Sequence, residues 1–450
     1  MAMRTILWCL LIKIFIINGS SANDCLLKNN ELNNHETANE EFQLCKDEQI
    51  VLNFSKTTIT KLEENFLTNT LLSCLKINNK GITKVSSTAF DKMPNLTYLN
   101  LANNSIEEDD LLIEGNLQNL KILILDSAYN LNDGFAKEIT LRGYYPSLEK
   151  LYLRNNDILL VKLEGLVFHE DNFSKLTHLY LNNNSIVLFN NPIAGGYTAV
   201  KYINLNNNNL LSVQVNLPAL EFLSFNYNQV WKLALIGTKK LVELYAAHNK
   251  LYEFTEESLQ ECEKLKILDL KNNEITKFSR VIFEKCISLE YLNLDNNEIS
   301  EIPVVNSTSY LKRFSLRWNR INSLRPDTFS LMPHLIVLRL DGNRIFKVEA
   351  NTFLTLVNLQ SLTLGNNQLA NLPENWSKNL RMLKNLNLEN NKFKMLEDLS
   401  LKQEDVILKL NLTDNPLEQL TRNSFMFIPE NTTVYLSSNA SGVESCVRSN

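Results

Sequence analysis

The 450-residue sequence contains few of the two residues that most often interrupt regular structure, with 12 glycines and 10 prolines. Together with a hydrophobic content of 44%, this scarcity argues against a disordered or low-complexity chain, despite 63 asparagines. Basic blocks are also missing, and the formal net charge is −5. We therefore expect neither nucleic acid nor an anionic membrane surface as a partner.

Catalytic signatures are missing as well. The five histidines have no zinc-type spacing, and they are His35, His169, His178, His248 and His334. The sequence has neither a glycine-rich phosphate loop nor a nucleophile elbow. We expect no catalytic, cofactor-binding or metal-binding residues and predict that the protein is not an enzyme.

Beyond the first 22 residues, no hydrophobic run approaches the about 20 residues that cross a bilayer. Residues 1–22 combine Arg4, an apolar run from Ile6 to Ile17, and small residues ending at Ala22. This pattern is typical of a secretory signal peptide, and the run is too short for the alternative of a membrane anchor. The tail GVESCVRSN lacks the hydrophobic end of a lipid-anchor signal, so we expect a soluble, extracellular mature chain.

One repeated unit dominates the rest of the sequence. Leu265, Leu268, Leu270, Asn273 and Ile275 form the pattern L-x-x-L-x-L-x-x-N-x-I, which returns 24 residues later. This is the leucine-rich repeat pattern. Leucines alternating with polar residues predict a short strand with one buried and one exposed face. The asparagine amide both donates and accepts, so it can satisfy backbone groups where each coil turns.

Copies of this unit extend over nearly the whole chain. The asparagine position is occupied in turn by Thr57, Lys80, Asn104, Ala128, Asn156, Asn184, Asn208, Asn228, Asn249, Asn273, Asn297, Asn319, Asn343, Asn367, Asn391, Asn415 and Asn439. We predict an α/β leucine-rich repeat solenoid, a curved horseshoe of about 17 repeats of mostly 24 residues with a parallel β-sheet on its concave face. The expected divisions are a signal peptide at 1–22, an amino-terminal cap at 23–48, the repeat domain at 49–446 and a tail at 447–450.

The cysteines leave several pairings open. Cys25 and Cys45 bracket the cap, which a disulfide between them would close; a flexible tail with two free thiols is the alternative. Cys262 and Cys286 occupy equivalent positions of adjacent repeats, where we expect two buried small hydrophobic residues, or alternatively a disulfide. Cys446 either links two chains or is a free thiol. The remaining cysteine of the repeats, Cys74, falls on a solvent-facing strand position without an obvious partner.

Outward positions of the predicted strands carry many aromatic and basic side chains, beginning with Tyr98. Tyrosine, tryptophan and arginine are the residue types that most often anchor protein interfaces. The candidate ligand-binding residues on the concave face are Tyr152, Tyr180, Tyr202, Tyr245, Tyr291, Arg313, Arg317, Trp318 and Arg339. The last four form a compact basic and aromatic cluster. The alternative is that exposed strands favour aromatic residues and that these rings merely cover the sheet.

Ten N-glycosylation sequons follow the predicted signal peptide, at Asn53, Asn95, Asn103, Asn172, Asn183, Asn306, Asn375, Asn411, Asn431 and Asn439. Asn53 and Asn411 should project from the strands near the two ends of the sheet. Glycans there would leave the middle of the concave face bare.

The repeats resemble those of extracellular leucine-rich repeat proteins such as Toll ectodomains and insect adhesion proteins. Two stretches are more similar to the mosquito leucine-rich repeat immune proteins of haemolymph: EQIVLNFSKTTITKLEENFL with the following LKINNKGITKV, and LPALEFLSFNYNQVWKLALIGTKKLVELYAAHNKL. That resemblance implies a disulfide-linked dimer that binds a complement-like thioester protein. The coiled coil and cysteine cluster that often follow the repeats in that family have no counterpart here.

We therefore expect a secreted, glycosylated, non-enzymatic binding protein that recognises a protein or microbial ligand through its concave face, in innate immunity. The expected partner is a complement-like thioester protein or a microbial surface molecule. The alternative is an extracellular cell-adhesion or developmental signalling ligand.

Overall fold

The computed structural model describes residues 58–107, 117–129, 145–159, 173–189, 199–304, 308–418, 420–421 and 423–436, with the backbone of 14–16, 51–53, 137–141, 160–163 and 190. The chain divides into two compact units. We call Cys25–Lys250 with Glu257–Cys262 the amino-terminal unit. The carboxyl-terminal unit comprises Met1–Asp24, Leu251–Glu256 and Glu263–Asn450.

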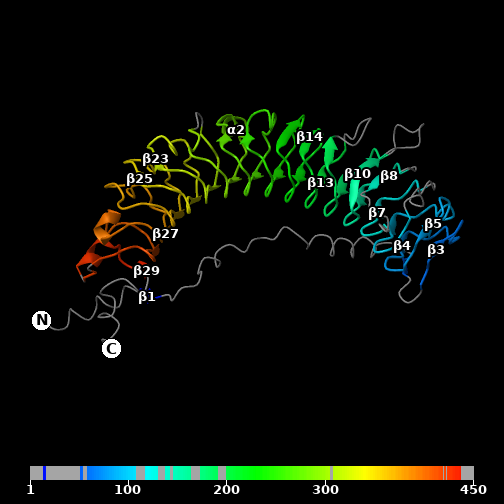
Figure 1. Ribbon diagram of the computed structural model, residues 1–450, viewed down its shortest axis with the longest axis horizontal. Helices are drawn as coiled ribbons and strands as arrows, with labels where there is room; N and C mark the ends of the chain where they lie inside the picture. The colour runs from blue at the N-terminus through cyan, green and yellow to red at the C-terminus, as the bar shows by residue number, and fades with distance from the viewer. Residues whose placement is uncertain are drawn as a thin grey trace. The chain divides into compact units, whose positions relative to one another are not determined.

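Each unit is a solenoid whose coils stack side by side, with one short strand per coil in a parallel sheet (Figure 1). In the amino-terminal unit these strands are β2 (Val51–Asn53), β4 (Cys74–Lys76), β6 (Tyr98–Asn100), β7 (Ile122–Ile124), β9 (Lys150–Tyr152), β11 (His178–Tyr180), β13 (Tyr202–Asn204), β15 (Phe222–Ser224) and β17 (Glu243–Tyr245). Neighbours pair without a change of register, so residues at equivalent repeat positions lie side by side.

The carboxyl-terminal unit continues the pattern with β19 (Ile267–Asp269), β21 (Tyr291–Asn293), β22 (Arg313–Ser315), β24 (Val337–Arg339), β26 (Ser361–Thr363), β27 (Asn385–Asn387), β28 (Lys409–Asn411) and β29 (Thr433–Leu436). A further strand, β1 (Ile14–Ile16), pairs with β29. Cleavage of the predicted signal peptide near Ala22 would remove β1.

The far side of the coils carries smaller parallel sheets and short helical turns. In the amino-terminal unit the sheets are β3 (Lys61–Leu62) with β5 (Lys84–Val85), β8 (Lys137–Leu141) with β10 (Ile158–Leu163), and β12 (Leu188–Asn190), β14 (Ser212–Asn216) and β16 (Lys232–Ile236) together. In the carboxyl-terminal unit they are β18 (Glu253–Phe254) with β20 (Lys277–Phe278), and β23 (Ser323–Leu324) with β25 (Lys347–Val348). Its helical segments are α2 (Val281–Lys285), η2 (Leu396–Leu399) and η3 (Ser424–Phe427).

Between the main sheet and this outer layer lies the hydrophobic core, which the repeated leucines fill. Leu265, Leu268, Leu270 and Ile275 are fully buried. Phenylalanines from successive coils stack beside them, as Phe329 and Phe353 do at a centroid distance of 6.1 Å. A single coil could not bury this surface alone, which is why the fold requires a stack of repeats.

The predicted asparagine ladder is present in both units. Asn297 Nδ2 donates to the carbonyls of Leu294 (3.1 Å) and Leu270 (3.0 Å), and its Oδ1 accepts from the backbone N of Ile275 (3.0 Å). The same amide therefore satisfies backbone groups of its own coil and of the preceding one. Buried asparagines at this position are Asn104, Asn156, Asn184, Asn208, Asn228, Asn249, Asn273, Asn297, Asn319, Asn343, Asn367, Asn391 and Asn415.

Candidate binding surface

A row of aromatic rings lies on the outward face of the amino-terminal sheet, and β11 contributes two of them, His178 and Tyr180. Tyr152 and Tyr180 stack at 4.3 Å between centroids, and Tyr202 and Phe222 at 4.2 Å. Tyr180 to Tyr202 is 5.0 Å, and Phe222 to Tyr245 is 5.6 Å. The first two pairs are register partners on adjacent strands, and the strand spacing of about 4.8 Å places their rings at stacking distance. The other two pairs are diagonal neighbours. These rings stabilise one another, and from Tyr180 to Tyr245 they are half-buried.

Tyr98 and Tyr152, which were expected to be exposed on the sheet face, are instead buried. They are only 3% and 2% exposed, and they belong to a hydrophobic cluster with Cys74, Ile122 and Ile124. Cys74 was expected to face solvent without a partner, but it is fully buried and disulfide-bonded. Apolar side chains at the outward positions of four adjacent strands pack together, which the pattern within any single repeat does not reveal.

A second polar ladder, which sequence reasoning missed, follows the strand ends. Asp126 Oδ1 accepts from the backbone N of Arg154 in the next coil at 2.7 Å. Arg154 also donates to Asp126 Oδ2 from Nε (2.8 Å) and from Nη2 (2.6 Å), and its guanidinium lies 5.1 Å from the Tyr152 ring centroid. Both donors of this guanidinium edge are therefore used within the chain.

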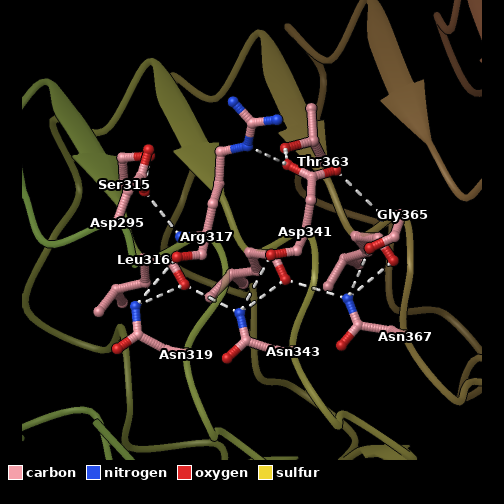
Figure 2. A network of polar contacts seen from close by, with 12 residues as sticks. Asp295, Ser315, Leu316, Arg317, Asn319, Asp341, Asn343, Thr363, Gly365 and Asn367 are labelled. Atoms are coloured by element: carbon pink, nitrogen blue, oxygen red, sulfur yellow. Dashed lines mark hydrogen bonds and ion pairs between the residues drawn. The ribbon is translucent and has the colours of Figure 1, made fainter. Parts of the chain in front are cut away.

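The carboxyl-terminal unit repeats this arrangement with buried aspartates (Figure 2). Asp295 accepts from Ser315 Oγ (2.5 Å) and from the backbone N of Arg317 (2.7 Å). Two coils further on, Asp341 accepts from the Thr363 hydroxyl and from the backbone N of Gly365 (3.1 Å). The sequence signal was an Asp directly after the third leucine of the L-x-x-L-x-L pattern, where a side chain can reach the next coil.

Arg317 occupies the position of Arg154 but is held differently. Its Nε lies 3.5 Å from Asp341 Oδ2, and Figure 2 draws no contact from its terminal nitrogens. The side chain is 37% exposed, compared with 21% for Arg154. The side chains of Arg313 and Arg339, on β22 and β24, make no hydrogen bond or ion pair with any residue that the structure describes. Three of the predicted arginines therefore retain donors for a partner.

Three aspartates of the carboxyl-terminal sheet have pKa values above the ordinary range. Burial raises the pKa of Asp269 to about 6, and it also raises the pKa values of Asp295 and Asp341. Tyr291 lies close by, and burial followed by the charges of Asp269 and Asp295 raises its pKa to about 12. The tyrosine is therefore a neutral, mostly buried member of this surface.

Trp318 sits in the turn that follows β22 and not on the strand itself. Its backbone is left-handed (φ 54°), its side chain is 49% exposed, and its ring rests against Gly342. The equivalent position is Asn in most coils, but in the amino-terminal unit it is Tyr227 and then His248, whose rings stack at 4.1 Å. The predicted cluster thus has two parts, arginines on the strands and a tryptophan at the turn.

Cys262 and Cys286 are both buried, as expected, and both are disulfide-bonded. Their selection as disulfide candidates is therefore confirmed, and the first expectation, of two unpaired hydrophobic residues, was wrong. Cys25, Cys45 and Cys446 lie outside the described residues, as do the sequons Asn172, Asn306 and Asn439 and the side chain of Asn53. Among described sequons, Asn95, Asn103, Asn183, Asn375 and Asn431 are exposed. The amide of Asn411 is half-buried and donates to Glu389 Oε2 at 2.8 Å.

Within the part of the chain that the structure describes, no three or more His, Cys, Asp or Glu side chains are grouped to hold a metal ion. None of the described helices is long and apolar enough to span a membrane.

Comparison with known proteins supports the same fold. The family described as "Leucine rich repeat" matches residues 239–299, 309–369 and 333–393, and the "BspA type Leucine rich repeat region" family matches residues 16–133. Mouse podocan is 28% identical over 261 residues, which cover 50% of this chain and 40% of podocan. Chicken lumican is 30% identical over 190 residues, which cover 39% of this chain and 50% of lumican. The chain thus spans half or less of the length of these relatives.

Two solved structures share the architecture at low sequence identity. A leucine-rich repeat protein of Leptospira interrogans aligns with a TM-score of 0.55 and 23% identity, covering 81% of this chain and 96% of that one. The Toll–Spatzle complex of Drosophila gives a TM-score of 0.57 and 18% identity, covering 82% of this chain and 47% of the matched chain. The repeat pattern, the ladder and these similarities identify the chain as a leucine-rich repeat protein with a Toll ectodomain-like fold.

Proposed function

We propose that the protein is a secreted, non-enzymatic binding protein that recognises a protein or microbial ligand through the outward face of its parallel sheet, in innate immunity. Ligand binding is the function that leucine-rich repeat proteins of the Toll and small proteoglycan type suggest. Disulfide-bonded Cys74, Cys262 and Cys286 are in keeping with an oxidising, extracellular environment.

The difference between Arg154 and Arg317 carries this proposal. Arg154 is bound to Asp126 by two short contacts, whereas the terminal nitrogens of Arg317, at the same repeat position beside the exposed Trp318, contact no residue that the structure describes. Arginine and tryptophan contribute a large share of interface energy where they are available to a partner.

The proposal is tested by capturing partners from haemolymph or another body fluid with the immobilised full-length protein. Replacing both Arg317 and Trp318 by Ala should weaken capture of the main partner by more than about 1 kcal/mol and leave the melting temperature nearly unchanged. Mass spectrometry under reducing and nonreducing conditions identifies the partner and shows whether Cys446 links two chains. A complement-like thioester protein and a microbial surface molecule are the partners that we expect.

A matched control replaces Arg320 by Ala. Arg320 lies just beyond the ladder asparagine and pairs with Glu298 at 2.7 Å, so its loss removes one charge without touching the sheet face. Equal capture by the Arg317/Trp318 variant and the wild type would remove this surface from consideration.

The second candidate function is an extracellular adhesion or developmental signalling ligand, since the Toll–Spatzle complex is described as a hub in both development and innate immunity. Transcript measurements separate the two functions. Induction by infection supports the immune role, and expression confined to embryonic or neural tissue contradicts it.

A further inference from the structure

Three arginines form a triangle on two adjacent strands of the carboxyl-terminal sheet. Arg313 begins β22, Arg317 follows the same strand, and Arg339 ends β24 in register with Ser315. At 3.3 Å per residue and about 4.8 Å between strands, the Cα atoms of Arg313 and Arg317 are roughly 13 Å apart, and Arg339 is roughly 8 Å from each. We call these residues the arginine triangle.

Two carboxylates, of Asp295 and Asp341, contact Arg317 and hold it in position. Asp295 accepts the backbone N–H of Arg317, and Asp341 lies 3.5 Å from its Nε. Asp341 is buried and Asp295 is half-buried, and each already accepts a backbone N–H group. They therefore position Arg317 without using its terminal donors. The guanidinium groups are therefore accessible to a partner, and the carboxylates lie closer to the sheet.

We propose that the arginine triangle binds the carboxylates of an acidic protein segment that lies extended across β22 and β24. This inference rests on the proposed function and names the chemistry of its partner. An extended segment projects every second side chain to one face at intervals of about 7 Å, which suits the spacing of the three arginines. Each guanidinium can hold a carboxylate through two parallel N–H donors, which a lysine cannot reproduce.

Local charge balance favours discrete carboxylates over a dense polyanion. Asp295 and Asp341 offset part of the positive charge of Arg317 and Arg339, and the chain as a whole carries a net charge of −5. A sulfated polysaccharide or a nucleic acid brings closely spaced charges that the aspartates and the net charge would repel. A single carboxylate aligned with a guanidinium forms two short hydrogen bonds, which offset the repulsion from the nearby aspartates and from the net charge.

The experiment measures fluorescence anisotropy of a labelled peptide with alternating Ser and Glu against the full-length protein, at about 50 mM and about 300 mM salt. We expect saturable binding that weakens at the higher salt and is lost for the Ser–Gln peptide. The double variant Arg313→Gln/Arg339→Gln should bind at least ten times more weakly. Neither side chain makes a hydrogen bond or ion pair with a described residue, so folding should be preserved.

Two further variants sharpen the assignment. Arg320→Gln removes a charge away from the sheet face and should bind like the wild type. Arg317→Lys keeps the charge and removes the fork, so it should weaken binding several-fold, which a purely electrostatic attraction would not produce.

Three results would overturn the inference: equal binding of the Gln peptide, no saturable binding up to millimolar peptide, or tighter binding of a heparin oligosaccharide that the triangle variants abolish. The last result would assign the surface to an acidic glycan. If the wild-type protein still captures a partner that the Arg317/Trp318 variant does not, the proposed function stands although the carboxylate inference fails.

Discussion

The ladder asparagine makes contacts that no other side chain supplies in full. At Asn297, one amide donates to two carbonyls in adjacent coils and accepts from a third backbone group. Aspartate would lose the donors, and serine or threonine would be too short to reach both coils. The position therefore specifies the register of neighbouring coils as well as their stability.

Replacing Asn297 by Ala should lower the free energy of unfolding by about 1 to 3 kcal/mol, because buried backbone groups lose their partners. Chemical unfolding followed by circular dichroism gives this value. The neighbouring Asn296 is exposed and left-handed (φ 53°), so Asn296→Gly is the matched control and should change stability by less than about 0.5 kcal/mol. Similar losses in the two variants would argue against a special role for the ladder amide.

The buried environment of Asp269 should make the folded protein less stable as the pH rises. Burial raises its pKa from 3.8 to about 6, so the folded state binds the proton more tightly than the unfolded chain does. Stability should therefore fall as the pH rises from about 4 to about 6 and then level off. Asp269→Asn keeps the acceptor for the Lys271 backbone N–H and removes this titration.

Urea unfolding at several pH values between about 4 and 7.5 compares the two proteins. The stability of the wild type relative to Asp269→Asn should decline by about 1 to 3 kcal/mol across this range. Asp295 and Asp341 titrate in both proteins, so the difference isolates Asp269. A difference that does not vary with pH would show that Asp269 is not the group responsible.

At the scale of the coil, the turn after each main strand from β4 to β28 ends in a left-handed residue. Asn fills this position in most coils because its short side chain tolerates a positive φ better than other residues. Trp318 adopts the same conformation at a cost, and its ring covers Gly342, which is the left-handed residue of the next coil. A bulky residue in a conformation that asparagine adopts at less cost is the kind of backbone outlier that favours a binding role.

Gly342→Ala tests this packing. A Cβ at this position would lie 2.4 Å from Trp318 Cδ2, and φ is +69°, so we expect a loss of about 2 to 4 kcal/mol in unfolding free energy. In the Trp318→Asn variant the clash with the tryptophan ring is absent, so Gly342→Ala should lower the unfolding free energy by only about 1 to 2 kcal/mol. A double-mutant cycle from urea unfolding measures the coupling, and additive effects would contradict contact between the two residues.

Local patterns predicted the coil but not the packing between coils. The alternation around Leu268 and Leu270 and the spacing of Asn273 were sufficient for the strand, the core and the ladder. The burial of Tyr98 and the distinct environments of Arg154 and Arg317 depend on residues one coil away, at separations of 22 to 28 positions. The sequence of a single repeat shows which side chains point outward. Contacts with the adjacent coils determine which of these side chains stay exposed to a partner.

For the whole chain, cysteine chemistry and the amino terminus test the proposed compartment. A secreted protein should begin near residue 23, carry glycans, and hold its structural cysteines as disulfides. The structure places Cys74, Cys262 and Cys286 in disulfides, and all three are fully or almost fully buried. The described sequons Asn95, Asn103, Asn183, Asn375 and Asn431 are exposed, as glycosylation requires.

Full-length protein expressed in insect cells and recovered from the medium allows all three features to be measured together. Intact mass before and after enzymatic deglycosylation should show loss of residues 1–22 and a fall in mass on glycan removal. Alkylation in denaturant should leave Cys74, Cys262 and Cys286 unmodified until a reductant is added, and a reduced sample serves as the control. Retention of the unprocessed chain inside the cell, or alkylation of Cys74 without reductant, would contradict an extracellular location, because a disulfide at that position would not persist in a reducing compartment.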